Sequence, residues 1–160
     1  MLFIPFGLWL CVIFILSSET YQEQSIQSNL HRYVSEETVR NLLPDLTIHY
    51  RTSVISSKRE PFLFVEFLFR KAAHIFTYGL LAILLYLALI PYKLRKVSKV
   101  LIILVVVTMI AGTDEWNQSR TAFRTAAIQD VGIDFAGGVI ALGMLLFVVS
   151  LVRRKEAEKK

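Results

Sequence analysis

The sequence contains a single cysteine, Cys11, which excludes an intramolecular disulfide and any metal site built from several cysteines. The residues just before Cys11 lack the small side chains expected ahead of a lipidated cysteine. There is also no HExxH zinc motif, no serine-nucleophile motif and no glycine-rich phosphate loop. The common signatures of metalloproteases, serine hydrolases and nucleotide-binding enzymes are therefore missing.

Apolar residues, by contrast, are abundant. They make up 54% of the 160 residues and give a mean hydropathy of +0.52. This is more than the core of a soluble domain of this size needs, so the composition predicts a membrane protein. At about 20 apolar residues per span, a chain of this length has room for about four transmembrane helices.

The apolar segments predict an all-α fold, a polytopic membrane helical bundle that forms one domain over residues 1–160. The four predicted transmembrane helices cover about residues 2–17, 62–90, 99–116 and 129–152. The first is short, and Pro5 and Trp9 make it irregular. It also has the length of a secretory signal, but no basic residue follows Met1 and no clear cleavage site follows the apolar run, so a retained helix is favoured over a cleaved one.

Residues 18–60 form the only sizeable polar segment outside the predicted spans. The apolar residues between positions 26 and 34 fall on one helical face. Ser35 and the two glutamates after it are typical of a helix start, and Pro44 would end that helix. Alternation of residue types over 48–52 predicts a short strand. We expect this segment to lie on the membrane surface as a cover rather than to contact a ligand.

The 18 Lys and Arg residues give a net charge of +5, but they lie mostly beside the spans and do not indicate a nucleic-acid partner. Nine of them are in the 92–99 gap and the 153–160 tail, whereas the 117–128 connection contains only two. By the positive-inside rule, the gap, the tail and both termini are predicted to be cytoplasmic. Segments 18–60 and 117–128 would then face outward, in a multi-pass protein of the cell membrane.

Ionisable and polar residues interrupt the spans at matching depth. On the predicted topology the outer half of the bundle receives Lys71, His74 and Tyr78 from the second span, Asp114, Glu115 and Gln118 from the third, and Asp130 and Asp134 from the fourth. A charged side chain that faces lipid costs a few kcal/mol or more, so these groups are expected to face the bundle interior and to pair with one another.

Two interpretations of these residues remain open. They are either internal ion pairs and hydrogen bonds that hold the helices together, or the lining of a ligand pocket. We favour the pocket, because so many polar groups beneath one short outer loop exceed what packing four helices requires. Gly137, Gly138 and Gly143 are expected to permit close helix packing rather than to contact a ligand, and Tyr92 and Trp116 to anchor the interfaces.

The motifs also resemble a known family. The residues that carry the resemblance are Arg70-Lys71-x-x-His74-x-x-x-Tyr78, then Asp114-Glu115-x-x-Gln118 with Arg124 six residues later, then Asp130-x-x-x-Asp134-x-x-Gly137. In order and spacing they are similar to the VanZ-like family over about residues 62–150. The chain departs from that pattern at Ala122-Phe123, where the family often has Pro-Gly, and at Ala141, where a glycine is common.

The resemblance implies a polytopic bacterial cell-envelope protein. The family is named for a member that lowers susceptibility to the glycopeptide teicoplanin without supplying enzymes that remodel peptidoglycan. The site residues that it implies are Lys71, His74, Tyr78, Asp114, Glu115, Gln118, Arg124, Asp130 and Asp134. No cofactor is implied.

Three classes of function compete. A binding protein would engage a membrane lipid, a lipid-linked cell-wall precursor or a glycopeptide antibiotic, and Lys71, His74 and Arg124 would contact anionic groups. An intramembrane enzyme would use His74 or a carboxylate as a general base, or a divalent metal held by carboxylates and the His74 imidazole, on a lipid substrate. A purely structural or interaction protein would need no ligand. Binding is preferred over catalysis, and the apolar inner halves of the spans disfavour ion transport.

Overall fold

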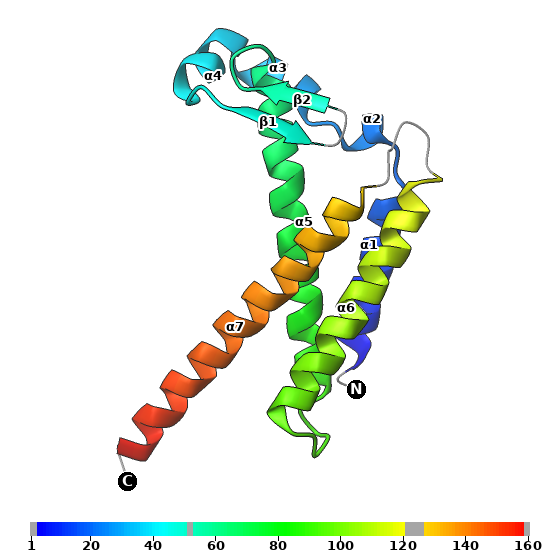
Figure 1. Cartoon of the computed structure of the whole chain (residues 1–160), viewed down its shortest axis with the longest axis vertical. Coiled ribbons are helices and arrows are strands. Elements are labelled where there is room, and N and C mark those ends of the chain that lie inside the picture. Colours follow the sequence, from blue (N-terminus) through cyan, green and yellow to red (C-terminus); the bar gives the residue numbers. More distant parts are fainter. Residues whose placement is uncertain (1–2, 51–52, 121–126, 159–160) are drawn as a thin grey trace.

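The structure, a computed structural model, describes residues 3–50, 53–120 and 127–158. Its long helices are α1 (Phe3–Ser18), α5 (Pro61–Ala88), α6 (Lys96–Gln118) and α7 (Ile128–Glu158). Between α1 and α5 lie the short helices α2 (Tyr21–Gln24), α3 (Gln27–Tyr33) and α4 (Glu36–Leu42), and the strands β1 (Thr47–Tyr50) and β2 (Ser53–Ser56). The short elements gather at one end of the long helices, here called the polar end (Figure 1).

Three helices, α5, α6 and α7, are long and apolar enough to cross a membrane. The 16 residues of α1 meet that test only together with residues 21–33, from which α1 is bent by 113°. At 1.5 Å per residue α1 extends about 24 Å, somewhat less than the roughly 30 Å of a hydrocarbon core. The prediction of a helical membrane bundle is therefore confirmed, with three to four candidate spans.

The helix bounds differ from the predicted spans mainly at the basic ends. α6 begins at Lys96, so basic residues of the 92–99 gap occupy its first turn. α7 was expected to end before Arg153 but continues to Glu158, so the start of the predicted tail is helical. Charged residues are good helix formers outside the apolar region, and hydropathy alone does not locate the end of such a helix.

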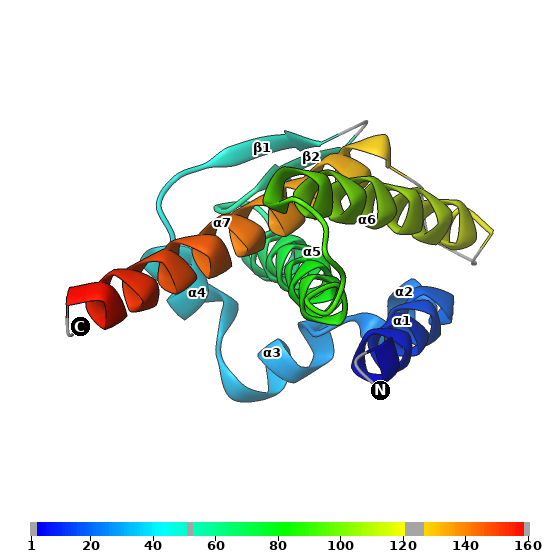
Figure 2. The same cartoon turned by 90° about the horizontal axis from the view of Figure 1, so that it is seen from below.

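Helix α5 is central to the bundle, with α7, α6 and α1 arranged around it (Figure 2). The buried apolar core joins all four long helices and consists of Ile13, Tyr78, Leu81, Ala82, Leu85, Ile103, Val107, Ala111 and Leu142. α7 crosses α5 near the middle of α5 and then diverges from α6 toward its C-terminus (Figure 1).

Small residues set the crossing of α5 and α7. A Cβ atom added to Gly137 would lie 2.6 Å from the carbonyl oxygen of Ile75, a distance that real Cβ atoms do not adopt. One added to Gly138 would lie 3.3 Å from Val107 Cγ1 on α6. The close packing expected at these two glycines is confirmed. At Gly143 it is wrong, because no atom lies within 4 Å of the added Cβ.

The short elements of the 18–60 segment follow the local sequence. Ser35 caps α4, and its hydroxyl accepts a hydrogen bond from the backbone N–H of Thr38, as the predicted helix start requires. The helix ends at Leu42, two residues before Pro44. The predicted strand corresponds to β1, which pairs antiparallel with β2 from Thr47↔Ser56 to Tyr50↔Ser53. Positions 51 and 52 of that prediction lie outside the described residues.

Candidate functional site

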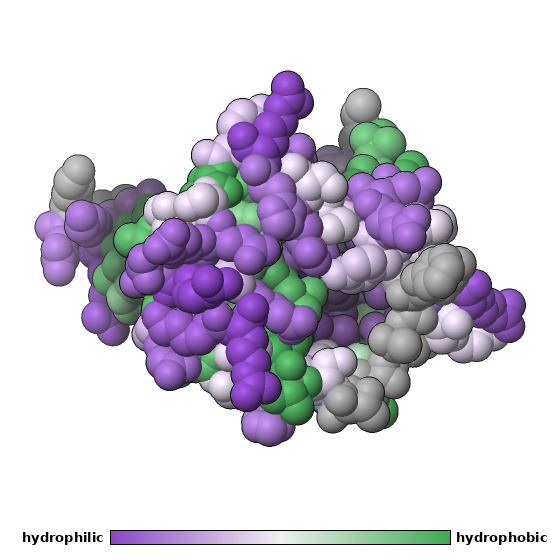
Figure 3. Space-filling view, turned by 90° about the horizontal axis from the view of Figure 1, so that it is seen from above, coloured by the Kyte–Doolittle hydropathy of each residue, from purple (hydrophilic) through white to green (hydrophobic). Residues whose placement is uncertain are grey.

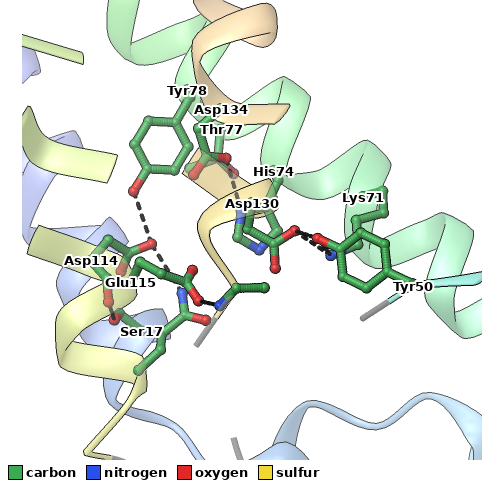
Figure 4. Close-up of polar contacts among 12 residues, drawn as sticks. Ser17, Tyr50, Lys71, His74, Thr77, Tyr78, Asp114, Glu115, Asp130 and Asp134 are labelled. Atoms are coloured by element: carbon green, nitrogen blue, oxygen red, sulfur yellow. Dashed lines mark hydrogen bonds and ion pairs between the residues drawn. The ribbon is translucent and has the colours of Figure 1, made fainter. Parts of the chain in front are cut away.

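Polar side chains cover the polar end of the molecule, seen from above in Figure 3. Within the bundle beneath them, five acidic residues are buried: Glu66, Asp114, Glu115, Asp130 and Asp134. Such a concentration of buried acidic groups needs compensating hydrogen bonds and cations, because an unpaired buried charge is strongly unfavourable. Figure 4 draws the contacts of four of them, Asp114, Glu115, Asp130 and Asp134.

Asp130, near the start of α7, pairs with a lysine from α5. Its Oδ1 atom forms an ion pair with Lys71 Nζ and accepts a hydrogen bond of 2.6 Å from the hydroxyl of Tyr50 on β1. Lys71 also lies 4.2 Å from the centroid of the Tyr50 ring. The hairpin of β1 and β2 is therefore joined to α5 and α7 at one point by a tyrosine, a lysine and a carboxylate (Figure 4).

Asp134 lies one helical turn below Asp130 and pairs with a histidine. His74 Nδ1 is 2.9 Å from Asp134 Oδ1, and Asp134 is only 1% exposed. The His74 ring stacks on the ring of Tyr78, with centroids 6.4 Å apart and an interplanar angle of 9°. A carboxylate on one ring nitrogen fixes the orientation of the imidazole, as in many catalytic and metal-binding histidines.

Asp114, near the end of α6, is held by donors from two helices. Its Oδ2 atom accepts hydrogen bonds from the Tyr78 hydroxyl at 2.8 Å and from Gln118 Nε2 at 3.0 Å. Its other carboxyl oxygen, Oδ1, is buried and has no hydrogen-bond partner among the described residues. The side chain therefore retains an unused acceptor.

Glu115, beside Asp114, closes the other side of the cluster. Its Oε1 atom accepts a hydrogen bond from the backbone N–H of Ala127, just before α7. On the α1 side, the Ser17 hydroxyl donates to the backbone oxygen of Asp114 at 3.5 Å and accepts a hydrogen bond from Asn117 at 3.0 Å. These contacts tie the end of α6 to α7 and to α1.

A second group of polar side chains surrounds Glu66, higher on α5. Ser25 donates a hydrogen bond of 3.0 Å to Glu66 Oε2, and an Arg70 guanidinium nitrogen lies 3.7 Å from Glu66 Oε1. Arg70 also lies over the ring of Tyr21, 4.7 Å from its centroid. Burial, together with the nearby Glu66 carboxylate, raises the pKa of the Tyr21 phenol above its ordinary value.

A cavity of about 290 Å³ lies between α1, α2, α5 and α6 beside these residues. Its polar lining comprises Ser17, Glu19, Gln24, Arg70, His74, Thr77, Tyr78, Asp114 and Gln118, and its apolar lining Ile13, Leu16, Phe69 and Ala73. Leu16 and Phe69 are 44% and 57% exposed, and Ala73 is exposed as well. One border of the cavity therefore lies at the bundle surface, where lipid chains surround a membrane protein.

The structure brings eight of the nine predicted site residues to the polar end. Four of them line the cavity: His74, Tyr78, Asp114 and Gln118. Lys71, Glu115, Asp130 and Asp134 lie behind, bonded to neighbouring helices or to the hairpin. Arg124 lies outside the described residues. Lys71, His74 and Tyr78, which were expected to share one stripe of the second span, each contact a buried acidic residue. Their role in binding a ligand stays a prediction.

Several cavity and network residues were absent from the predicted site. In the sequence, Tyr50 contributed only to the alternation that predicts a strand. Ser17, Thr77 and Gln24 belong to no motif that distinguishes them from other polar residues near helix ends. Arg70 was part of the family motif, and its ionisable side chain inside an apolar run was the signal that pointed to it. Among the described residues, no three His, Cys, Asp or Glu side chains are placed to hold a metal ion together.

The fold and the site define a multi-pass helical membrane protein with a buried polar cluster at one end. The sequence matches the model of the VanZ/LLP1 family over residues 2–150. The chain belongs to this family, and the match extends the resemblance from about residue 62 to the start of α1. No curated protein and no solved structure matches the chain.

Proposed function

We propose that this chain is a cell-envelope binding protein whose cavity takes up an amphiphilic molecule from the outer leaflet. One observation carries the proposal: a single cavity combines buried polar groups with an apolar border that is exposed at the bundle surface. An amphiphile matches both parts, with its polar group against His74 and Asp114 and its chain passing between Leu16 and Phe69. Pockets that bind ligands commonly combine an apolar lining with a few convergent polar groups.

The candidate ligands are a membrane lipid, a lipid-linked cell-wall precursor and a lipidated glycopeptide antibiotic. Sequestering the last, or altering access to its target, would lower antibiotic susceptibility. His74 and Arg70 would contact anionic groups, and Asp114 would accept hydrogen bonds from amines or amides. In this proposal Lys71 holds Asp130 in place and does not reach the ligand.

Binding of labelled lipid-linked precursor, and separately of labelled teicoplanin, to the purified protein tests the proposal. We expect His74→Ala to weaken binding about tenfold, which corresponds to roughly 1.4 kcal/mol. The matched control is His49→Ala, since His49 is exposed on β1. Ala73→Trp fills the border of the cavity without removing a buried polar contact, and should weaken binding too. Equal binding by wild type, His74→Ala and Ala73→Trp would overturn the proposal.

The outward orientation of the cavity is part of the proposal and is supported by the distribution of basic residues. In a Cys11→Ser background, a cysteine at exposed Asp45 should react with a membrane-impermeant maleimide on intact cells, whereas one at exposed Glu156 should react only after lysis. The reverse pattern would place the cavity on the cytoplasmic side.

An intramembrane enzyme is the second candidate, favoured by the pair His74–Asp134. His74 lines the cavity while Asp134 holds its Nδ1 at 2.9 Å, the arrangement of an oriented general base. Incubation with labelled precursor or phospholipid, followed by mass spectrometry, should yield a product that is lost in His74→Gln and Asp134→Asn if this candidate is right. Recovery of unchanged lipid from wild type would exclude those substrates for the enzyme candidate.

A further inference from the structure

Side chains of opposite charge at the cavity indicate what kind of head group it takes. Arg70 and Asp114 both line it, one cationic and one acidic, and they come from different helices, α5 and α6. Building on the proposed binding function, we infer that the ligand is a phospholipid whose head group carries both a phosphate and a primary ammonium, as in phosphatidylethanolamine.

On the acidic side of the cavity, a carboxyl oxygen of Asp114 lacks a hydrogen-bond donor among the described residues. Asp114 is 4% exposed, and its Oδ2 atom already accepts two hydrogen bonds, whereas Oδ1 has no partner among the described residues. A buried acceptor without a donor costs about 1–3 kcal/mol, and more when the group is charged. A primary ammonium supplies three N–H donors together with the opposite charge.

A second acidic residue favours a cation over a neutral donor at this place. Glu19 also lines the cavity, and its Oε2 atom accepts a hydrogen bond of 3.1 Å from Gln24. A hydroxyl or amide could satisfy the free oxygen of Asp114, but only a cationic group also offsets the charge of two carboxylates.

The basic side of the cavity fits a phosphate. Arg70 lies 3.7 Å from Glu66, which is within ion-pair range but too long for a hydrogen bond. The guanidinium carbon of Arg70 lies over the Tyr21 ring, and no described residue accepts a hydrogen bond from the guanidinium group. Its N–H donors are therefore available, and a planar guanidinium with fixed donors suits two oxygens of a phosphate.

The size and border of the cavity are consistent with this ligand. At about 290 Å³ it is at the lower end of the roughly 300–1,000 Å³ range of small-molecule pockets. It has room for a phosphoethanolamine head group, whereas of a larger amphiphile such as a glycopeptide it could hold only a part. The acyl chains would leave through the exposed border formed by Leu16, Phe69 and Ala73.

Three phospholipids with identical acyl chains separate the contributions. Phosphatidylethanolamine has phosphate and N–H donors, phosphatidylcholine has phosphate and a quaternary ammonium without N–H, and phosphatidylglycerol has phosphate and no cation. Native mass spectrometry of the full chain, delipidated in detergent and titrated with each lipid, would measure retention. We expect wild type to retain phosphatidylethanolamine about tenfold more tightly than either of the others, a difference of roughly 1.4 kcal/mol.

Substitutions at Asp114 and Arg70 test which residue recognises which part of the head group. Asp114→Asn should remove the preference for phosphatidylethanolamine over phosphatidylcholine, and Asp45→Asn, an exposed matched control, should keep it. Arg70→Gln should weaken retention of all three phosphate-bearing lipids, whereas Arg32→Gln, also exposed, should not.

The retention measurements distinguish a failure of the head-group preference from a failure of the proposed binding function. Equal retention of the three lipids by wild type, or a preference that persists in Asp114→Asn, would overturn the head-group inference. The proposed binding function would still stand if Ala73→Trp lowered retention of every lipid. If wild type retained no lipid better than Ala73→Trp, both this inference and uptake of phospholipid by the cavity would be wrong.

Discussion

The hydroxyl of Tyr78 donates a hydrogen bond of 2.8 Å to Asp114 Oδ2, joining α5 to α6 inside the bundle. Both residues line the same cavity. Tyr78 thus stabilises a buried carboxyl group through one of its oxygens, while the other oxygen, Oδ1, has no donor among the described residues.

Tyr78→Phe should destabilise the protein, because it removes one of the two donors to Asp114 while keeping the ring. The loss of a hydrogen bond to a buried acidic group predicts a decrease of about 1–3 kcal/mol in the free energy of unfolding. Denaturant titration in detergent micelles measures it. Tyr86→Phe is the control, since Tyr86 packs against the core and its hydroxyl has no hydrogen bond to the described residues. Equal effects of the two substitutions would contradict the assigned role.

Gly137→Ala should disrupt the crossing of α5 and α7. The added Cβ would lie 2.6 Å from the Ile75 carbonyl oxygen, which is backbone and can move only with its helix. Overpacking of this kind typically costs about 1–3 kcal/mol and should lower the midpoint of thermal unfolding. Gly143→Ala, on the same helix with open space around it, should leave the midpoint unchanged or raise it. A lowered midpoint in Gly143→Ala alone would show that the crossing is placed wrongly.

Lys71 and Asp130 should behave as a coupled pair. Lys71→Met leaves Asp130 without its cation and should cost about 2–3 kcal/mol, less than the roughly 3–5 kcal/mol of fully buried pairs because the Lys71 side chain is 17% exposed. Lys71→Met combined with Asp130→Asn should recover part of that loss. A double-mutant cycle in the free energy of unfolding measures the coupling, and additive effects would exclude it.

Tyr21 should hold its proton at a pH where the unfolded chain has lost it. Burial and the Glu66 carboxylate raise the pKa of its phenol above about 10, so this group stabilises the fold below pH about 10 and the contribution is lost as pH rises through the folded pKa. The tyrosinate absorbance of wild type minus Tyr21→Phe should therefore titrate at higher pH in native than in denatured protein. Glu66→Gln should reduce the difference; an unchanged difference would show that Glu66 does not contribute.

The positions of the long helices could be predicted from the sequence, and so could the inward orientation of the polar stripe on α5. Continuous apolar runs locate α5, α6 and α7, and the spacing of Lys71, His74 and Tyr78 requires one helical face. The cost of a charge in lipid then requires that face to point inward, where the structure has all three residues in contact with acidic partners.

The individual pairings and the cavity could not be predicted in the same way. Which carboxylate meets Lys71 depends on the crossing of α5 and α7, which the contact of Gly137 with Ile75 sets and which sequence spacing does not report. The hairpin contact from Tyr50 and the cavity border formed by α1 are long-range contacts between segments with no shared motif. The spans predicted from hydropathy also stopped short of the helices at their basic ends, because hydropathy measures the apolar stretch and not the extent of the helix.

The central claim is that an amphiphile enters the cavity through its border between α1 and α5, and photo-crosslinking tests it most directly. Wild type reconstituted with a trace of phospholipid bearing a photoreactive acyl chain should be labelled preferentially at residues near Leu16 and Phe69. Ala73→Trp, which fills the border, should abolish that preference, while Ala72→Trp, on the neighbouring exposed position outside the cavity, should preserve it. Labelling spread evenly over Leu16, Phe69 and the exposed Phe147 of α7, and unaffected by Ala73→Trp, would contradict the account.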